Sequence, residues 1–213
     1  MPLPRPTRLL DRDPAGSPEA DDDGLLALVG RGDAEAYERL AARWGSPVRD
    51  YLRRLTGERE ASDDLLQEVL VAVWRSAAAR DAATPFAVWL FTIARNAALS
   101  HLRRRSARAR LLAVLAAAPR ALLARFERRA PATPPDDVIG MEFAAAFDAA
   151  LLRLPEEFRS VFLLREREGL SYEEIAAIVA VPAKTVSTRL VRAREKLRRE
   201  LAPWLGDARR RPA

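Results

Sequence analysis

The sequence has no cysteine and a single histidine, His101. These absences exclude disulfide bonds, zinc sites built on thiolates, cysteine nucleophiles and any pair of catalytic histidines. We therefore expect no metal ion and no catalytic centre made from such groups. On its own, His101 is expected to be an ordinary residue on the surface of a helix.

Long apolar runs are also absent. No segment approaches the roughly 20 apolar residues that a membrane-spanning helix needs. The N-terminal residues Met1-Pro2-Leu3-Pro4-Arg5-Pro6 lack the apolar core of a secretion signal. These features predict a soluble, cytoplasmic protein. Its 213 residues suffice for two small domains and a linker.

Lysine is scarce, because Lys184 and Lys196 are the only ones and every other basic side chain is arginine. The net charge of +6 is typical of a protein with a polyanionic partner. An excess of arginine and alanine also arises from a GC-rich coding sequence, so the position of the charge is more informative than its total. Nine arginines and one acid, Glu127, lie between residues 103 and 129.

Composition and periodicity divide the chain into five parts. Residues 1–21 are rich in proline and aspartate and are expected to be disordered. Residues 22–105 and residues 141–205 have the apolar spacing of helices. Between them, residues 106–140 are expected to form a flexible basic linker, and residues 206–213 a basic tail. No strand pattern is present, so we predict an all-α fold of two small helical domains.

Local signals place several helix ends in the first domain. Asp33 is expected to cap a helix that buries Tyr37, Leu40 and Trp44. The segment Gly45-Ser46-Pro47 is expected to break or kink that helix. Ser62, followed by two aspartates, is expected to begin the next helix, and Thr84-Pro85 the last one.

A helix-turn-helix is predicted in the second domain. Ser171 and Glu174 have the spacing of a capping box, and Ala180-Val181-Pro182 forms the turn. The helix that follows, residues 183–194, carries hydroxyls and arginines on one side, as a helix in the DNA major groove requires. On its other side, Val186 and Leu190 should pack against Ile175 and Val179. The alternative is a surface hairpin with a solvated basic face.

The helix over residues 63–77 is expected to have a second functional face. Leu66, Val69, Leu70, Val73 and Trp74 occupy its buried side. The opposite side carries a strip of residues at helical spacing: Asp64, Gln67, Glu68 and Val71. This strip suits docking to a basic protein surface, and spacing alone leaves a merely solvated acidic face as the alternative.

Aromatic side chains, arginines and Asn96 are interleaved between Pro85 and Arg105. Such a mixture is used by single-strand nucleic-acid sites, where rings stack on bases and cations contact phosphates. The competing interpretation is that the aromatic residues form the core. We assign Phe86 and Trp89 to the core and expect Phe91 to be the most exposed.

Four motifs in order resemble the extracytoplasmic-function (ECF) branch of bacterial RNA polymerase sigma factors. They are Asp64-Leu65-Leu66-Gln67-Glu68-Val69, Trp89-Leu90-Phe91-Thr92-Ile93-Ala94-Arg95-Asn96, Leu154-Pro155-Glu156-Glu157 and Gly169-Leu170-Ser171-Tyr172-Glu173-Glu174-Ile175-Ala176. The resemblance implies a protein without a catalytic centre or cofactor. Such a protein binds core RNA polymerase, through the coiled coil of the largest subunit and the flap, and helps to open promoter DNA. An anti-sigma factor is a further partner that the family implies.

The resemblance also implies roles for individual residues. Asp64, Gln67, Glu68 and Val71 match the helix that binds the polymerase coiled coil. The loop 79–84 and the helix after it match the part that holds an unstacked minus-ten base, with the DNA-binding positions Arg80, Asp81, Thr84, Arg95, Asn96 and Arg103. The recognition helix matches the reader of the minus-thirty-five element, with the positions Lys184, Thr185, Ser187, Thr188, Val191 and Arg192.

Three features depart from the family pattern. One is the break expected at Gly45-Ser46-Pro47, which falls within a helix that the family usually keeps more regular. Ala180 stands where a glycine is frequent, and an alanine in a left-handed conformation is strained by roughly 1 kcal/mol, so another turn geometry is an alternative. Lys184 also replaces a frequent glycine and adds a phosphate contact. Two other classes compete with a sigma factor. A response-regulator-like transcription factor needs an N-terminal domain with strands, and a nucleic-acid enzyme needs clustered carboxylates.

Overall fold

The computed structural model describes residues 22–115 and 138–207, and every regular element in these ranges is a helix. The first domain contains α1 (Asp22–Val29), α2 (Ala34–Thr56), α3 (Arg59–Ser76), the short 3-10 helix η2 (Ala77–Ala79) and α4 (Phe86–Leu115). The second contains α5 (Val138–Arg153), α6 (Glu156–Glu166), α7 (Tyr172–Val179), α8 (Ala183–Glu200) and α9 (Ala202–Asp207). The all-α prediction is confirmed. The expected disordered tail 1–21 and the middle of the expected linker lie outside the described residues, as do residues 208–213.

Helix α2 is continuous, so the break expected at Gly45-Ser46-Pro47 is wrong. Its start agrees with the prediction, because Asp33 accepts a hydrogen bond from the backbone N–H of Ala36 at 3.0 Å. A proline inside a helix costs about 3 kcal/mol. The same helix buries Val48, Tyr51 and Leu52 almost completely, and each such side chain contributes about 1.5–3 kcal/mol. The free energy gained by burying these side chains therefore exceeds the cost of the proline.

Helix α3 begins at Arg59, so the start expected at Ser62 is also wrong. Ser62 is buried, and its hydroxyl donates to the backbone carbonyl of Arg59 at 2.5 Å. A serine within the first turn can form this bond without being the cap. Further along α3, Trp74 is 40% exposed rather than buried, with its ring edge-to-face against Tyr37 at 5.2 Å.

The burial of Phe91 corrects a further expectation, since this residue is 0% exposed instead of being the most exposed aromatic. Helix α4 packs against α2 and α3 on one side and against α7 of the second domain on another. Near the start of α4, the Phe91 ring packs edge-to-face against Trp44 and Tyr51 of α2. Phe86 is buried as predicted, and Trp89 is half-buried.

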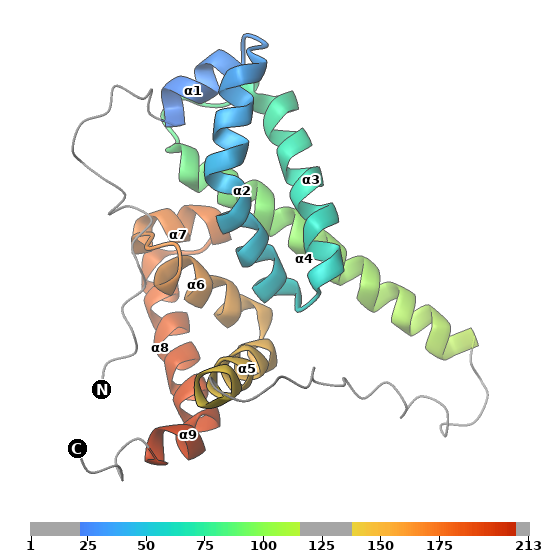
Figure 1. The fold of residues 1–213 in the computed structure, drawn as a ribbon, viewed down its shortest axis with the longest axis vertical. Helices are drawn as coiled ribbons and strands as arrows, with labels where there is room; N and C mark the ends of the chain where they lie inside the picture. Colours follow the sequence, from blue (N-terminus) through green and yellow to red (C-terminus); the bar gives the residue numbers. More distant parts are fainter. Residues whose placement is uncertain (1–21, 116–137, 208–213) are drawn as a thin grey trace.

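The two domains pack directly on each other. Figure 1 shows α1 to α4 in the upper part of the molecule and α5 to α9 below, with α6 and α7 against α2 and α4. The buried side chains of both domains form one continuous hydrophobic cluster. Helix α4 then continues past this body as far as Leu115 (Figure 1). Alanine, leucine and arginine favour helix, so the beginning of the expected linker is helical.

The helix-turn-helix forms as predicted. The Ser171 hydroxyl accepts from the N–H of Glu174 at 3.2 Å, and the Glu174 carboxylate accepts from the N–H of Ser171 at 2.7 Å. Ala180 adopts the left-handed conformation, with φ 54° and ψ 48°. Its N–H donates to the carbonyl of Ala176, which ends α7. The turn thus takes the left-handed form despite the alanine, and the alternative turn geometry is not adopted.

We expect Ala180→Gly to stabilise the protein by about 1 kcal/mol. The left-handed conformation costs an alanine roughly 1–2 kcal/mol, and the greater freedom of glycine in the unfolded chain offsets part of this gain. Ala177→Gly is the matched control, because Ala177 is exposed inside α7 and its replacement should destabilise by about 1 kcal/mol. Urea unfolding of the two variants tests this, and destabilisation by both would contradict the strain at Ala180.

Candidate nucleic-acid and protein interfaces

The strip predicted on α3 lies on the surface. Asp64, Gln67 and Glu68 are exposed, and Val71 is 45% exposed although it is apolar. Opposite them, Leu65, Leu66, Val69 and Val73 are buried. The Glu68 carboxylate lies 3.9 Å from the guanidinium of Arg104 on α4. An exposed pair at this distance is weak, so the carboxylate stays available to a partner.

The loop between η2 and α4 is held together by Arg80. Its side chain is 6% exposed and hydrogen bonds to the Asp23 carboxylate and to the carbonyl of Thr84. The guanidinium also lies 6.0 Å from the centre of the Trp89 ring. Asp81 accepts from the N–H of Ala83 at 3.0 Å. In this arrangement Arg80 supports the loop, and Asp81 is exposed.

Of the three remaining minus-ten candidates, two share an exposed side of α4 and one faces the second domain. Asn96 and Arg103 are exposed. Arg95 points to the second domain, where its guanidinium lies 3.3 Å from the Ser160 hydroxyl and 3.3 Å from the Glu156 carboxylate. Its side chain is only 13% exposed. The structure therefore brings Asn96 and Arg103 to solvent and places Arg95 in the contact between domains.

Helix α8 presents the predicted face to solvent. Lys184, Thr188, Val191 and Arg192 are exposed, while Thr185 and Ser187 are half-buried. Val186 and Leu190 on the other side of α8 are fully buried. In α7, Ile175 is fully buried, and Ile178 and Val179 are nearly so. The Thr188 hydroxyl donates to the carbonyl of Lys184 at 3.0 Å. No acidic partner of Lys184 or Arg192 lies within the described part of the chain.

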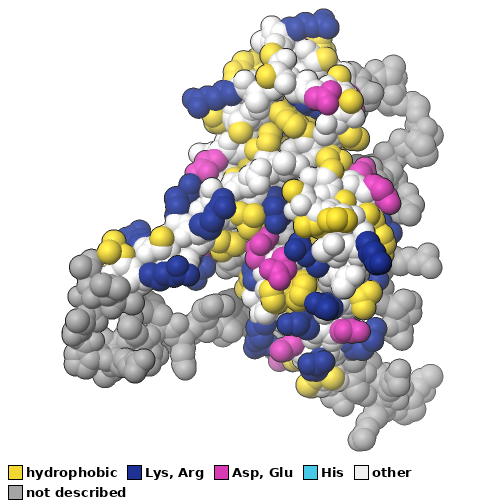
Figure 2. Space-filling view, turned by 180° about the vertical axis from the view of Figure 1, so that it is seen from behind, with side chains coloured by type: hydrophobic (Ala, Val, Ile, Leu, Met, Phe, Trp, Pro, Cys, Tyr) yellow, Lys and Arg dark blue, Asp and Glu magenta, His cyan; other side chains and the backbone are white. Residues whose placement is uncertain are grey.

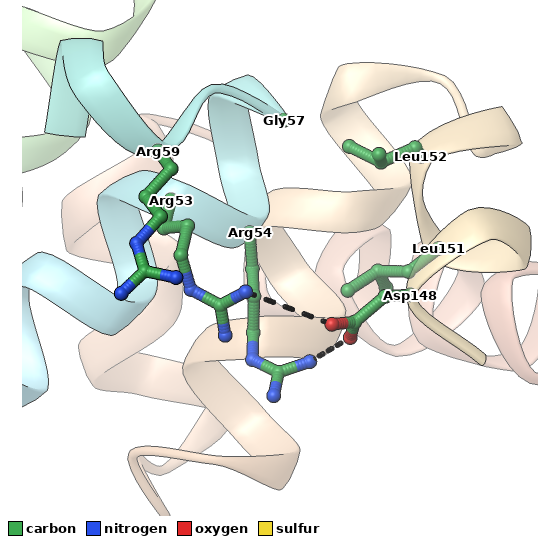
Figure 3. A pocket seen from close by; sticks show the side chains of 7 residues that line it. All are labelled: Arg53, Arg54, Gly57, Arg59, Asp148, Leu151 and Leu152. Carbon is green, nitrogen blue, oxygen red and sulfur yellow. Dashed lines mark hydrogen bonds and ion pairs between the residues drawn. The ribbon is translucent and has the colours of Figure 1, made fainter. Parts of the chain in front are cut away.

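Sequence reasoning missed the polar contacts between the domains. Asp148 of α5 accepts from Arg54 of α2 and lies 3.7 Å from Arg53, beside a hollow of about 120 Å³ (Figure 3). The C-cap of α2, Gly57, lies against this hollow with φ 78°. A Cβ there would approach the Leu152 side chain to 2.7 Å. No spacing signal predicts such pairs, because their members are far apart in the chain.

A buried hydrogen bond links the same two domains. The hydroxyls of Tyr51 and Ser160 are 3.0 Å apart, and burial raises the pKa of Tyr51. Arg159 of α6 donates to the carbonyl of Leu55 in α2 at 2.6 Å. Buried polar groups cost free energy unless they are paired, so these bonds favour one specific arrangement of the domains.

A buried carboxyl group, Glu168, lies beside this contact. Its side chain is 6% exposed, and its Oε2 atom has no hydrogen-bond partner among the described residues. Burial raises the pKa of Glu168 from 4.5 to about 7. Arg167 opposes this shift and Asp50 adds to it. The carboxyl group is therefore stable here mainly in its protonated form.

We expect the protein to lose stability as the pH rises through 7. Because the pKa of Glu168 is higher in the folded than in the unfolded chain, its stabilisation is complete below about pH 4.5 and is lost as pH rises through about 7. The resulting loss in the free energy of unfolding is on the order of 3 kcal/mol. Glu168→Gln should remove this part of the pH dependence, whereas Glu157→Gln changes an exposed carboxylate and should not. Urea unfolding between pH 5 and 8 measures it, and identical profiles for the two variants would contradict the assignment.

No group of three or more histidine, aspartate or glutamate side chains in residues 22–115 and 138–207 is arranged to hold a metal ion. In the same ranges, no helix combines the length and the apolar character needed to cross a membrane.

Comparison with known proteins places the chain in a family. The model of sigma-70 region 2 matches residues 40–108, and the model of sigma-70 region 4 matches residues 144–197. The chain is 30% identical to the RNA polymerase sigma-H factor of Pseudomonas aeruginosa over 89% of its own length and 98% of that protein. It is 30% identical to the ECF RNA polymerase sigma-E factor of Haemophilus influenzae over 86% and 97%. The chain belongs to the ECF sigma factors.

Solved structures agree with this membership. CnrH, in complex with the cytosolic domain of CnrY, is 27% identical with a TM-score of 0.62, covering 85% of this chain and 97% of that one. The fold of the sigma factor RpoE from Bartonella quintana, in complex with the anti-sigma factor NepR, also matches with a TM-score of 0.62. In this sigma factor, region 2 thus falls on α2 to α4 and region 4 on α5 to α8. The response-regulator alternative is not favoured.

Proposed function

We propose that this ECF sigma factor binds core RNA polymerase, directs it to promoters and opens the duplex for initiation. Its main support is that both sigma-70 regions match in one chain whose candidate docking strip and recognition helix lie on the surface. The protein acts without a catalytic centre or cofactor of its own, and its place of action is the cytoplasm. Core polymerase, promoter DNA and an anti-sigma factor are its partners. One of the two solved structures above is a sigma factor bound to an anti-sigma factor, and the other is also a complex with a second protein.

Adding the purified chain to core polymerase tests this proposal. With a promoter identified by mapping transcription starts after overexpression, the chain should support specific initiation in vitro. Core polymerase alone is the control. If specific initiation also required a second sigma factor, the chain would be an ordinary activator, and the proposal would be wrong.

In this proposal the α3 strip contacts the coiled coil of the largest polymerase subunit, and region 4 contacts the flap. The exposed carboxylates of Asp64 and Glu68 supply negative charge, Gln67 supplies hydrogen bonds, and Val71 supplies an apolar contact. An apolar residue surrounded by polar ones is typical of protein interfaces. The strip is therefore a complete small docking surface on one helix.

The minus-ten element is read by α4 and the loop before it. Asn96 and the loop residues Asp81 and Thr84 hold a base that has left the stack, while Arg80 keeps the loop in shape. Arg103 contacts the backbone. Arg95 can reach DNA only after α6 moves away from it, because Glu156 and Ser160 now occupy its guanidinium. Promoter binding thus requires the two domains to separate.

For the minus-thirty-five element we expect Arg192→Ala to weaken binding by about 1–3 kcal/mol and to relax base preference. Arg192 lies in the middle of the exposed face of α8, whereas Lys184 lies in its first turn. Lys184→Ala should instead weaken binding to all sequences equally and flatten the salt dependence by about one phosphate contact. Selection from a randomised duplex library by the holoenzyme, at two salt concentrations, distinguishes them. An unchanged consensus with Arg192→Ala would make Arg192 a backbone contact.

A further inference from the structure

Beyond Arg103, the part of α4 that projects from the body has no role in the function proposed so far. The region 2 match ends at residue 108, while the helix continues to Leu115. Its residues from Arg103 to Leu112 are all exposed. Figure 2, which views the molecule from behind, shows basic side chains along this projecting arm. The arm is therefore a charged surface that no neighbouring helix covers.

One side of α4 continues from the candidate minus-ten site onto this arm. Asn96, Arg103 and Arg110 are seven residues apart in succession. Seven residues make nearly two turns of a helix, with a drift of only about 20°, so the three side chains lie along one line. All three are exposed. At about 1.5 Å per residue the line is about 21 Å long, which is about six base-pair steps of DNA.

The arginines of the arm differ in their partners. Arg104 lies 3.9 Å from Glu68, and Arg105 lies 2.5 Å from Glu58. Within the described ranges, Arg103, Arg108 and Arg110 have no acidic partner. Of these three, Arg108 is turned about 160° from Arg110 around the helix axis, at about 100° per residue. Only Arg103 and Arg110 therefore extend the line that starts at Asn96.

We propose that Arg103 and Arg110 form a track for the phosphates of the double-stranded promoter DNA on the upstream side of the minus-ten element. The inference rests on the proposed function and names an additional DNA contact for it. A guanidinium binds phosphate through charged, often bidentate hydrogen bonds. The arm has no aromatic side chain between Arg103 and Leu112, and single-strand sites use aromatic rings for stacking. A backbone contact to duplex DNA fits this composition.

The direction of the helix supports the upstream side. Asn96 is nearer the body, and Arg110 lies towards the end of α4, from which the chain leads to region 4. Region 4 reads the minus-thirty-five element in the proposed function, and that element is upstream of the melted bases. The far end of the arm is thus directed along the duplex that separates the two elements.

The test compares Arg110→Ala with Arg108→Ala in the full-length chain bound to core polymerase. Both substitutions remove one exposed positive charge that has no acidic partner in residues 22–115 and 138–207, and alanine preserves helix propensity. We expect Arg110→Ala to make the slope of log K against log salt shallower by about 0.9 on duplex promoter DNA. Arg103→Ala with Arg110→Ala should change the slope by about 1.8. Arg108→Ala should leave the slope at the parent value.

A second DNA separates the duplex from the melted strand. On a promoter fragment trimmed to remove the duplex upstream of the minus-ten element, Arg110→Ala and the parent should bind with equal slopes. If Arg110→Ala and Arg108→Ala give equal slopes of log K against log salt on the full duplex, the proposed phosphate contact of Arg110 is wrong. An effect of Arg110→Ala that persists on the trimmed fragment would overturn its assignment to duplex DNA. Failure of the parent chain to initiate transcription would instead refute the proposed function.

Discussion

Replacing Asp64 and Glu68 together with arginine is expected to weaken binding to core polymerase by about 2–5 kcal/mol, which is about 30-fold to several thousand-fold. Both carboxylates are exposed on one side of α3, and the buried side of the helix is separate from them. The fold should therefore remain intact. The loss is large because each positive charge now faces the basic partner surface that the carboxylates match.

The control is Glu35→Arg with Glu38→Arg. These two glutamates are exposed on α2, so the double substitution changes the net charge equally without touching the α3 strip. Co-purification with core polymerase, followed by a binding titration, measures the effect. If the α3 variant binds as well as the α2 variant, the acidic strip is merely a solvated face.

Asn96→Ala is expected to leave binding to duplex promoter nearly normal and to impair opening. Unstacking a base costs a few kcal/mol, and an amide that holds the flipped base compensates this cost. The Asn96 side chain is exposed and makes no hydrogen bond within the described residues, so its replacement should leave the fold intact. Ser100→Ala, one turn further along α4, serves as the control.

Permanganate footprinting of the promoter measures the opening, because it modifies thymines that have left the stack. Strong reactivity with the parent and with Ser100→Ala, and weak reactivity with Asn96→Ala, is the expected pattern. If melted thymines react equally in all three, Asn96 has no part in holding the base.

Local features of this sigma factor could be predicted from sequence because their members lie within one or two helical turns. The capping box Ser171–Glu174 and the Asp33 cap each join residues three apart. The exposed strip on α3 and the two sides of α8 follow from a period of 3.6 residues. For such features, spacing along the chain is almost the same as spacing in the folded protein, so the sequence alone determined them.

Other features were decided only by the tertiary structure. Phe91 is buried because its ring packs edge-to-face against Trp44 and Tyr51 of α2, which lie far from it in the chain. Pro47 stays inside α2 because distant helices bury its neighbours. Arg95 meets Glu156 across 61 residues, and Tyr51 meets Ser160 across 109. Such contacts depend on how the two domains pack, and the free energy of packing is a sum over the whole interface that no single segment carries.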